Sequence, residues 1–213
     1  MKKLLLTDGE QMASAASDES GHSEVARVFF ALWPDEPCAG RLRAIAERLA
    51  ERFAGRAMQQ ETLHLTLVFV GDVNTERLPD LLALASEVEE ELRSSAPVFP
   101  DSGPLLLDRL GYWQHKRLLW MGSEHCPAAL GFLAELLAGK LRARGYAISL
   151  RPFVPHVTLV RKAKRIPPTP ELEALNPAAL AWPCGSFVLV RSRLSSLGAA
   201  YERLGTWKLG CPD

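Results

Sequence analysis

Apolar residues along this chain gather in short runs of strand length, separated by Gly, Pro, Asp and charged residues. Runs of this kind, rich in Val, Leu, Phe and Thr, favour β-strands. Strands are expected at residues 27–33, 63–70, 97–99, 105–110, 118–121, 148–150, 153–160, 187–192 and 201–209. Pro34 ends the first of these strands, and Gly71 with Asp72 ends the second. Several neighbouring runs lie at hairpin distance, which is typical of antiparallel pairing.

Three other segments repeat their apolar residues at helical spacing. They cover residues 36–54, 75–93 and 127–144. In the first, Leu42, Ile45 and Leu49 belong to one apolar stripe. Loops are expected at 166–170 and 177–183, which are rich in proline. Because strands outnumber helices, the pattern predicts an α+β fold with mainly antiparallel sheets.

The first 24 residues differ from the rest of the chain, since they are mostly small and polar. Such a segment buries little apolar surface, so residues 1–24 are expected to be a disordered N-terminal extension. Residues 25–213 are predicted to form a single domain, which is long enough to enclose a sizeable core. The apolar run that begins at Leu4 ends at Thr7, too early for a signal peptide.

Composition narrows the possible partners of the chain. Lys and Arg together number 25, as do Asp and Glu, so the net charge is zero. A neutral chain lacks the broad basic surface of proteins that bind long nucleic acids, although a local basic pocket remains possible. The four cysteines show no C-x-x-C or zinc-site spacing, which favours reduced thiols in a cytoplasmic protein. No stretch reaches the roughly 18–20 apolar residues that a membrane span needs.

One short pattern occurs twice, nearly half the chain apart. Residues 63–68 are Leu-His-Leu-Thr-Leu-Val, and residues 155–160 are Pro-His-Val-Thr-Leu-Val. Two of only five histidines in the chain thus fall in matching His-x-Thr-Leu-Val contexts. One strand histidine alone would more often be a structural residue of a core. The matched pair, with its matched neighbours, favours a functional site instead.

Strand geometry determines which side chains of the repeat lie together. Residues two apart on a strand share a face, so His64 lies beside Thr66 and His156 beside Thr158. Histidine titrates near neutral pH and can act as a general acid or a general base. The threonine hydroxyls can donate hydrogen bonds to the non-bridging oxygens of a phosphate during transfer. The two motifs therefore suit in-line cleavage of a phosphodiester, with one proton acceptor and one proton donor.

The repeat and its surroundings resemble the two-histidine phosphoesterase superfamily. The likeness is strongest to its bacterial and archaeal RNA 2',3'-cyclic phosphodiesterase branch, also called the 2'-5' RNA ligase family. It rests on Arg-Val-Phe-Phe-Ala at 27–31, on the first motif with Phe-Val-Gly at 69–71, and on Arg-Pro-Phe-Val-Pro-His-Val-Thr-Leu-Val-Arg at 151–161. This resemblance, which covers roughly residues 27–209, implies two pseudo-symmetric lobes around a V-shaped cleft.

The resemblance also implies roles. His64 would be the proton donor, His156 the proton acceptor, and Arg161 a phosphate contact beside Thr66 and Thr158. Arg161 and His156 are five residues apart, so a regular strand would put them on opposite faces. A strand end or a bulge near Val160 would be needed to bring Arg161 to the site.

Other polar and aromatic residues have two interpretations. Lys162, Lys164 and Arg165 follow Arg161 and form either a solvated loop or a rim that attracts RNA phosphates. His115 lies in a hairpin turn or on a base-stacking rim, and the turn is favoured. Either Phe29 or Phe30 could stack on a base, but strand parity lets only one of them face the cleft.

The predicted reaction is hydrolysis of an RNA-terminal 2',3'-cyclic phosphodiester to a 2'-phosphomonoester, without a metal or cofactor. Threonine is a poor metal ligand, and no carboxylate cluster accompanies the histidines. The partners would be RNA ends or short oligoribonucleotides, and the protein would be a monomer. Two alternatives remain: 2'-5' RNA ligation with the cyclic phosphate as donor, and a non-catalytic module that binds RNA ends. Binding alone needs no acid/base pair, which disfavours the module.

Overall fold

The computed structural model describes residues 24–94, 104–195 and 198–210. The expected N-terminal extension and the strand expected at 97–99 therefore lie outside the described residues, apart from Glu24. The strands are β1 Val25–Leu32, β2 Arg56–Ala57, β3 Leu65–Asn74, β4 Leu105–Leu107, β5 Arg109–Trp113, β6 Leu118–Gly122, β7 His156–Arg161, β8 Leu180–Trp182, β9 Ser186–Ser195 and β10 Gly198–Lys208. The α-helices are α1 Glu36–Arg52, α2 Leu78–Ser94, α3 Ala128–Ala143 and α4 Thr169–Ala174.

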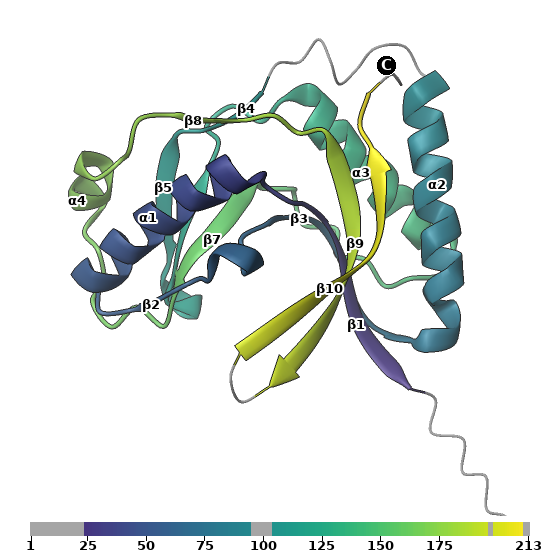
Figure 1. Ribbon diagram of the computed structural model, residues 1–213, viewed down its shortest axis with the longest axis horizontal. Coiled ribbons are helices and arrows are strands. Elements are labelled where there is room, and N and C mark those ends of the chain that lie inside the picture. Colours follow the sequence, from purple (N-terminus) through teal and green to yellow (C-terminus); the bar gives the residue numbers. More distant parts are fainter. Residues whose placement is uncertain (1–23, 95–103, 196–197, 211–213) are drawn as a thin grey trace, which may run out of the picture.

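Eight of the strands form one sheet in which all pairs are antiparallel, and its order is β10-β9-β1-β3-β7-β6-β5, with β2 paired to β7. Its two halves, β10-β9-β1-β3 and β7-β6-β5 with β2, meet where β3 pairs with β7. Among the described residues this contact has a single registered pair, Leu65 with Val157. The halves diverge from that pair into two lobes (Figure 1). The predicted α+β, antiparallel, two-lobed fold is confirmed.

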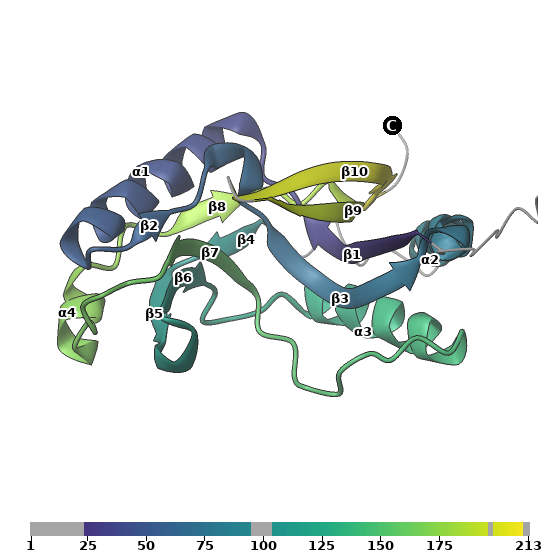
Figure 2. The ribbon, with the colours of Figure 1, turned by 90° about the horizontal axis from the view of Figure 1, so that it is seen from below.

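Each half of the sheet is covered by helices. Two of these helices directly follow a strand of one half of the sheet but pack against the other half. Helix α1 follows β1 yet packs against β2 and β7, whereas α3 follows β6 yet packs against β3 (Figure 2). Helix α2 packs on α3 and β10, and α4 contacts β5. No helix in the described part of the chain is both long and apolar enough to cross a bilayer.

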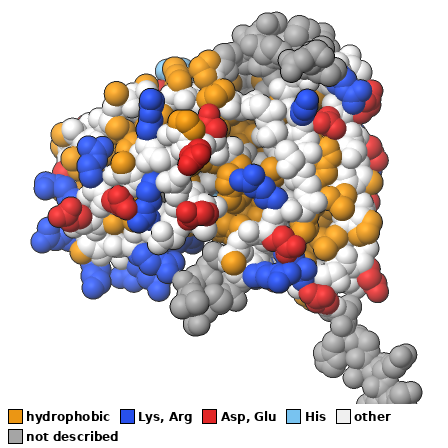
Figure 3. Space-filling model, in the orientation of Figure 1, with side chains coloured by type: hydrophobic (Ala, Val, Ile, Leu, Met, Phe, Trp, Pro, Cys, Tyr) orange, Lys and Arg blue, Asp and Glu red, His pale blue; other side chains and the backbone are white. Residues whose placement is uncertain are grey.

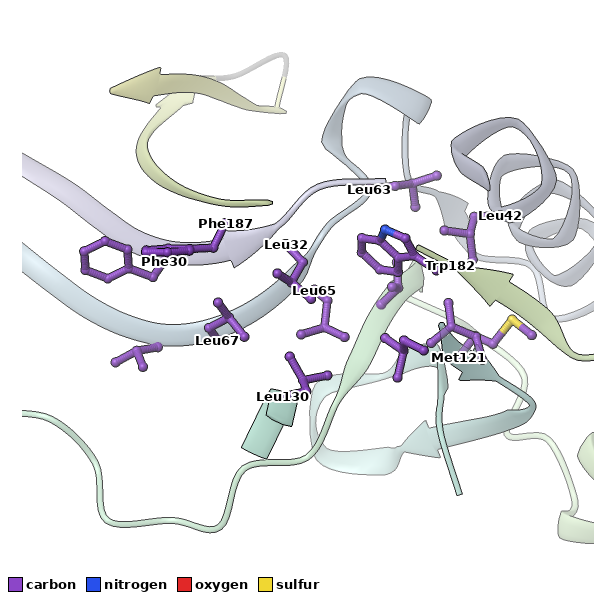
Figure 4. Close-up of a cluster of buried hydrophobic side chains, with 14 of the residues drawn as sticks. Phe30, Leu32, Leu42, Leu63, Leu65, Leu67, Met121, Leu130, Trp182 and Phe187 are labelled. Atoms are coloured by element: carbon purple, nitrogen blue, oxygen red, sulfur yellow. The ribbon is translucent and has the colours of Figure 1, made fainter. Parts of the chain in front are cut away.

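The hydrophobic core lies between the sheet and these helices. Phe30 and Leu32 point into it from alternate positions of β1, and Leu65 and Leu67 do the same from β3 (Figure 4). The intervening β1 residues belong to a second, smaller apolar cluster on the opposite face of the sheet, which includes Phe29. This opposite face carries the two His-x-Thr motifs.

The local signals that start and end α1 are satisfied in the structure. The Asp35 carboxylate accepts a hydrogen bond from the Cys38 N–H, and Pro37 occupies the first turn, where its missing N–H costs nothing. At the other end Ala54 adopts a left-handed conformation, and the Gly55 N–H donates to the Ala50 carbonyl. The three predicted helices are confirmed to within a few residues, with a short 3₁₀ turn at the start of the second.

Some expected boundaries were wrong. Residues 148–150 form no strand, and the loops expected at 166–170 and 177–183 contain the start of α4 and the whole of β8. Pro168 and Pro170 suit the cap and first turn of a short helix, where proline is tolerated. The second expected strand does not end at Gly71. It continues as β3 to Asn74, with Gly71 at a φ of 97°.

Candidate active site

The two motifs lie side by side at the junction of the lobes. Leu65 of β3 is opposite Val157 of β7, and both side chains are fully buried. One step along this antiparallel register, His64 is level with Thr158 and Thr66 with His156. These four residues are only partly buried and share the other face of the sheet. The motifs are thus related by a local twofold axis through the Leu65–Val157 pair.

Both imidazole rings are held by the same kind of hydrogen bond. His64 Nδ1 lies 2.8 Å from the Thr62 carbonyl oxygen, and His156 Nδ1 lies 2.7 Å from the Val154 carbonyl oxygen. A carbonyl only accepts, so each Nδ1 carries the hydrogen and donates it. In each neutral ring, Nε2 therefore has a free lone pair with which it can accept a proton.

A β-bulge in β7 resolves the parity problem of Arg161. Thr158 and Val160 pair with adjacent residues of β6, so Leu159 is the extra residue. Leu159 and Val160 are both fully buried, so the alternation of faces is shifted by one position. Arg161 thereby returns to the face of Thr158, where it is exposed.

Strand β3 contains the matching bulge. Thr66 and Val68 pair with adjacent residues of β1, and Leu67 between them is extra. Leu67 and Val68 are both buried, and the next residue, Phe69, is 55% exposed. The Leu-Val that follows each His-x-Thr is thus the bulge itself. Phe69 in the first motif occupies the position of Arg161 in the second.

Aromatic side chains enclose His64. Its ring stacks with Phe29 at 4.8 Å and with Trp33 at 5.2 Å between ring centroids, and Tyr201 meets it edge-on at 5.2 Å. Burial lowers the pKa of His64 to about 4, although its hydrogen bond to the Thr62 carbonyl opposes the shift. In the free protein near pH 7 this ring is therefore neutral.

Positively charged groups of the second motif also affect the pKa of the histidine in the first motif. Arg161 lowers the pKa of His64, as does the neighbouring His156 ring, in addition to the larger effect of burial. Arg161 likewise opposes the rise that burial causes in the pKa of Tyr201. These couplings mean that the guanidinium and the two imidazoles share one electrostatic environment.

A tryptophan pair flanks His156. Trp113 meets its ring edge-on at 4.5 Å between centroids, and Trp120 does so at 6.1 Å. The Trp120 indole packs closely against Gly111 and Gly122, which leave room for it. A Cβ at these glycines would come within 2.0 Å and 2.8 Å of the indole, respectively. Burial is also the main reason that the pKa of His156 is lowered.

The other residues singled out in the sequence have varied positions. Phe29 faces the cleft side but packs behind His64, whereas Phe30 lies in the core. His115 is in the turn between β5 and β6, which is the position that the sequence favoured. The backbone N–H groups of Lys164 and Arg165 both donate to the carbonyl of Phe53, the residue that follows α1. On the face shown in Figure 3, Lys and Arg side chains gather at the left end of the molecule, where α1 ends and α4 lies, and they are interspersed with Asp and Glu.

Sequence reasoning missed the aromatic residues around the histidines. Trp33 could have been found, since it continues the alternation that starts at Phe29 in the strand expected at 27–33. No sequence pattern pointed to Tyr201, Trp113 or Trp120, because they lie on strands distant in sequence from the histidines that they contact. Within the described residues, no three of His, Cys, Asp and Glu gather closely enough to hold a metal ion.

Comparisons with known proteins agree with this geometry. Residues 32–98 match the family model of LigT-like phosphoesterases. An RNA 2',3'-cyclic phosphodiesterase of Escherichia coli K12 is 33% identical over 192 residues, covering 88% of this chain and 98% of the relative. The Thermus thermophilus enzyme of the same name is 31% identical over 195 residues, covering 86% of this chain and 90% of the relative.

Solved structures extend the likeness. The apo crystal structure of E. coli LigT superposes with a TM-score of 0.67 at 29% identity, covering 89% of this chain and 100% of that one. LigT in complex with 3'-AMP superposes with a TM-score of 0.65, also at 29% identity, covering 87% of this chain and 99% of that one. The sequence identity, its extent and the shared fold together show that this chain belongs to the family of LigT-like, two-histidine phosphoesterases.

Proposed function

We propose that the protein hydrolyses the 2',3'-cyclic phosphodiester at RNA ends, using His64 and His156 as its acid/base pair. The observation that carries the proposal is the twofold arrangement of the motifs. The two imidazoles, each held through Nδ1 by a backbone carbonyl, lie where β3 and β7 begin, and each is level with a threonine of the other motif. The relatives named RNA 2',3'-cyclic phosphodiesterase support the same substrate class.

The chemistry follows from the two free Nε2 atoms. His156 accepts a proton from water, and the oxygen attacks phosphorus. The bond from phosphorus to the ribose 3'-oxygen breaks, and His64 donates a proton to that oxygen. The product is a 2'-phosphomonoester with a free 3'-hydroxyl. His64 takes up its proton when substrate binds, because an anionic phosphate beside the ring favours the imidazolium and raises the lowered pKa.

Three further groups surround the proposed phosphate position. Thr66 and Thr158 donate their hydroxyl hydrogens to the non-bridging oxygens, where charge accumulates in the transition state. Arg161 adds a permanent positive charge on the same face, supplied by the bulge in β7. All three act on charge that grows during the reaction, so they contribute to rate more than to initial binding.

The test is incubation of the purified protein with an oligoribonucleotide ending in a 2',3'-cyclic phosphate, in buffer with EDTA, followed by product mapping. The expected product is the 2'-phosphate, formed at full rate in the chelator. Activity that needs a divalent ion would contradict the proposal, as would binding without turnover. A second strand with a 5'-hydroxyl in the same reaction tests for ligation, which would appear as a longer product.

We further propose that the protein acts as a monomer on RNA ends in the cytoplasm. The cysteines within the described residues, Cys38, Cys126 and Cys184, are all free thiols, as a reducing compartment allows. Light scattering of the active protein gives its mass directly. A dimer that retains activity only above its dissociation constant would contradict the monomer.

A further inference from the structure

A groove of about 1060 Å³ begins at the proposed active site and leads away from it. It contains Thr66 and His156 and continues between β3, α3 and the segment that links α3 to β7. Figure 2 shows this segment running along α3 beneath β3. Small-molecule sites typically occupy about 300–1,000 Å³, so the groove has room for far more than one phosphoryl group.

The groove is locally basic although the chain is neutral. The exposed side chains of Lys116, Arg142 and Arg151 line it, with Glu135 as the carboxylate among the lining residues. None of the three cations forms an ion pair within the described part of the chain. Their charges are therefore available to a ligand, and the charge balance of the groove selects an anion.

The groove also presents apolar surface to solvent. Phe69, Val154 and Leu150 line it and are 55%, 44% and 84% exposed, respectively. Phe69 is directed to this face by the bulge in β3, and Gly71 lies beside its ring. An exposed aromatic ring in a groove that also contains cationic side chains is typical of sites that stack a base of a single-stranded nucleic acid.

We propose that this groove binds the RNA strand on the 5' side of the terminal nucleotide. Phe69 stacks on a base, and Arg142 and Arg151 bind a backbone phosphate. The inference rests on the proposed function. In a 2',3'-cyclic end both the 2'- and 3'-oxygens are bonded to phosphorus, so the chain continues only through the 5'-oxygen. A polynucleotide that leaves the site through this groove is therefore the upstream strand.

The experiment compares two substrates with the same reacting end. One is adenosine 2',3'-cyclic monophosphate, and the other is a tetraribonucleotide that ends in the same cyclic nucleotide. Loss of base stacking costs about 1–3 kcal/mol per base, so Phe69→Ala should lower kcat/KM for the tetramer about 5- to 150-fold. It should leave kcat/KM for the mononucleotide within about twofold. Phe132→Ala is the matched control, because Phe132 is 41% exposed on α3 but does not line the groove.

The charged half of the proposal has a separate readout. The double variant Arg142→Gln, Arg151→Gln should weaken tetramer binding and flatten the dependence of its KM on salt, because fewer counterions are released. Arg48→Gln, at an exposed position of α1 outside the groove, is the matched control. An unchanged salt dependence would contradict a phosphate contact at these residues.

The outcomes separate this inference from the proposed function. Equal losses on both substrates in Phe69→Ala, or no loss on either, would overturn the groove assignment while hydrolysis itself stands. If the unaltered protein hydrolyses neither substrate, the proposed function fails. In that case, tetramer binding measured by fluorescence anisotropy, if weakened by Phe69→Ala but not by Phe132→Ala, would still support the groove.

Discussion

The two halves of the site have the same backbone but different surroundings. Each has a His-x-Thr motif, a ring held through Nδ1 and a Leu-Val bulge. His64, however, is enclosed by Phe29, Trp33 and Tyr201, whereas His156 borders the open groove. The repeat thus fixes where the imidazoles are, and the neighbouring side chains fix how readily each one is protonated.

The largest expected effect tests whether both halves take part in one displacement. His64→Ala and His156→Ala should each lower kcat about 10²–10⁴-fold, since each removes one of the two proposed proton-transfer groups. The double variant should lose less than the product of the single losses, because the groups act on one transition state. Circular dichroism checks the fold. Near-normal turnover in both single variants would refute the acid/base assignment.

An activated substrate distinguishes the two halves. A nitrophenyl phosphodiester has a leaving group that needs little protonation, so it should largely restore the activity of His64→Ala. It should not restore His156→Ala, because water must still lose a proton. Initial rates on the ester and on an RNA end are compared for both variants. The reverse pattern would exchange the roles of the histidines, and equal rescue would mean that the ester binds in both orientations.

The threonines should matter less than the histidines, and to similar extents. Thr66→Val and Thr158→Val keep the strand shape but remove one hydrogen bond to developing charge. A loss of about 10-fold in kcat is expected for each, equivalent to about 1.5 kcal/mol. A loss as large as that of a histidine variant, for one threonine only, would show that the twofold arrangement does not extend to the phosphate oxygens.

The last prediction concerns stability rather than turnover and follows from the enclosure of His64. Its pKa is about 4 in the folded protein, against about 6.5 when unfolded. Between these values the unfolded state binds more protons, so the free energy of unfolding should fall as pH is lowered from about 6.5 to 4. The contribution is at most about 3 kcal/mol. Urea titrations at several pH values measure it.

Two variants serve as controls for the stability prediction. His64→Gln cannot ionise at this position, so its unfolding free energy should depend less on pH. His156→Gln should have a smaller effect on that dependence, because the His156 ring borders the groove and is less enclosed. If the pH dependence is the same in His64→Gln as in the unaltered protein, the enclosure of His64 does not govern its protonation.

The sequence predicted the positions of the two motifs better than it predicted the residues around them. Period-two alternation correctly placed each motif histidine on the same face as the threonine two residues later, because strand parity is a local property. The same rule required a bulge near Val160 for Arg161, and the structure has one. Tyr201 and Trp113 could not be found this way, because their approach to the histidines depends on strand order.

The exchange of α1 and α3 between the lobes has a consequence for biosynthesis. A nascent chain that has released β1 and α1 from the ribosome has no surface on which α1 can bury its apolar stripe, because β7 is translated nearly half a chain later. Contacts so distant in sequence slow folding and leave intermediates prone to aggregation. Completion of the fold must therefore wait for the C-terminal half, and a truncated product that ends before β7 should be a target for chaperones rather than a stable single lobe.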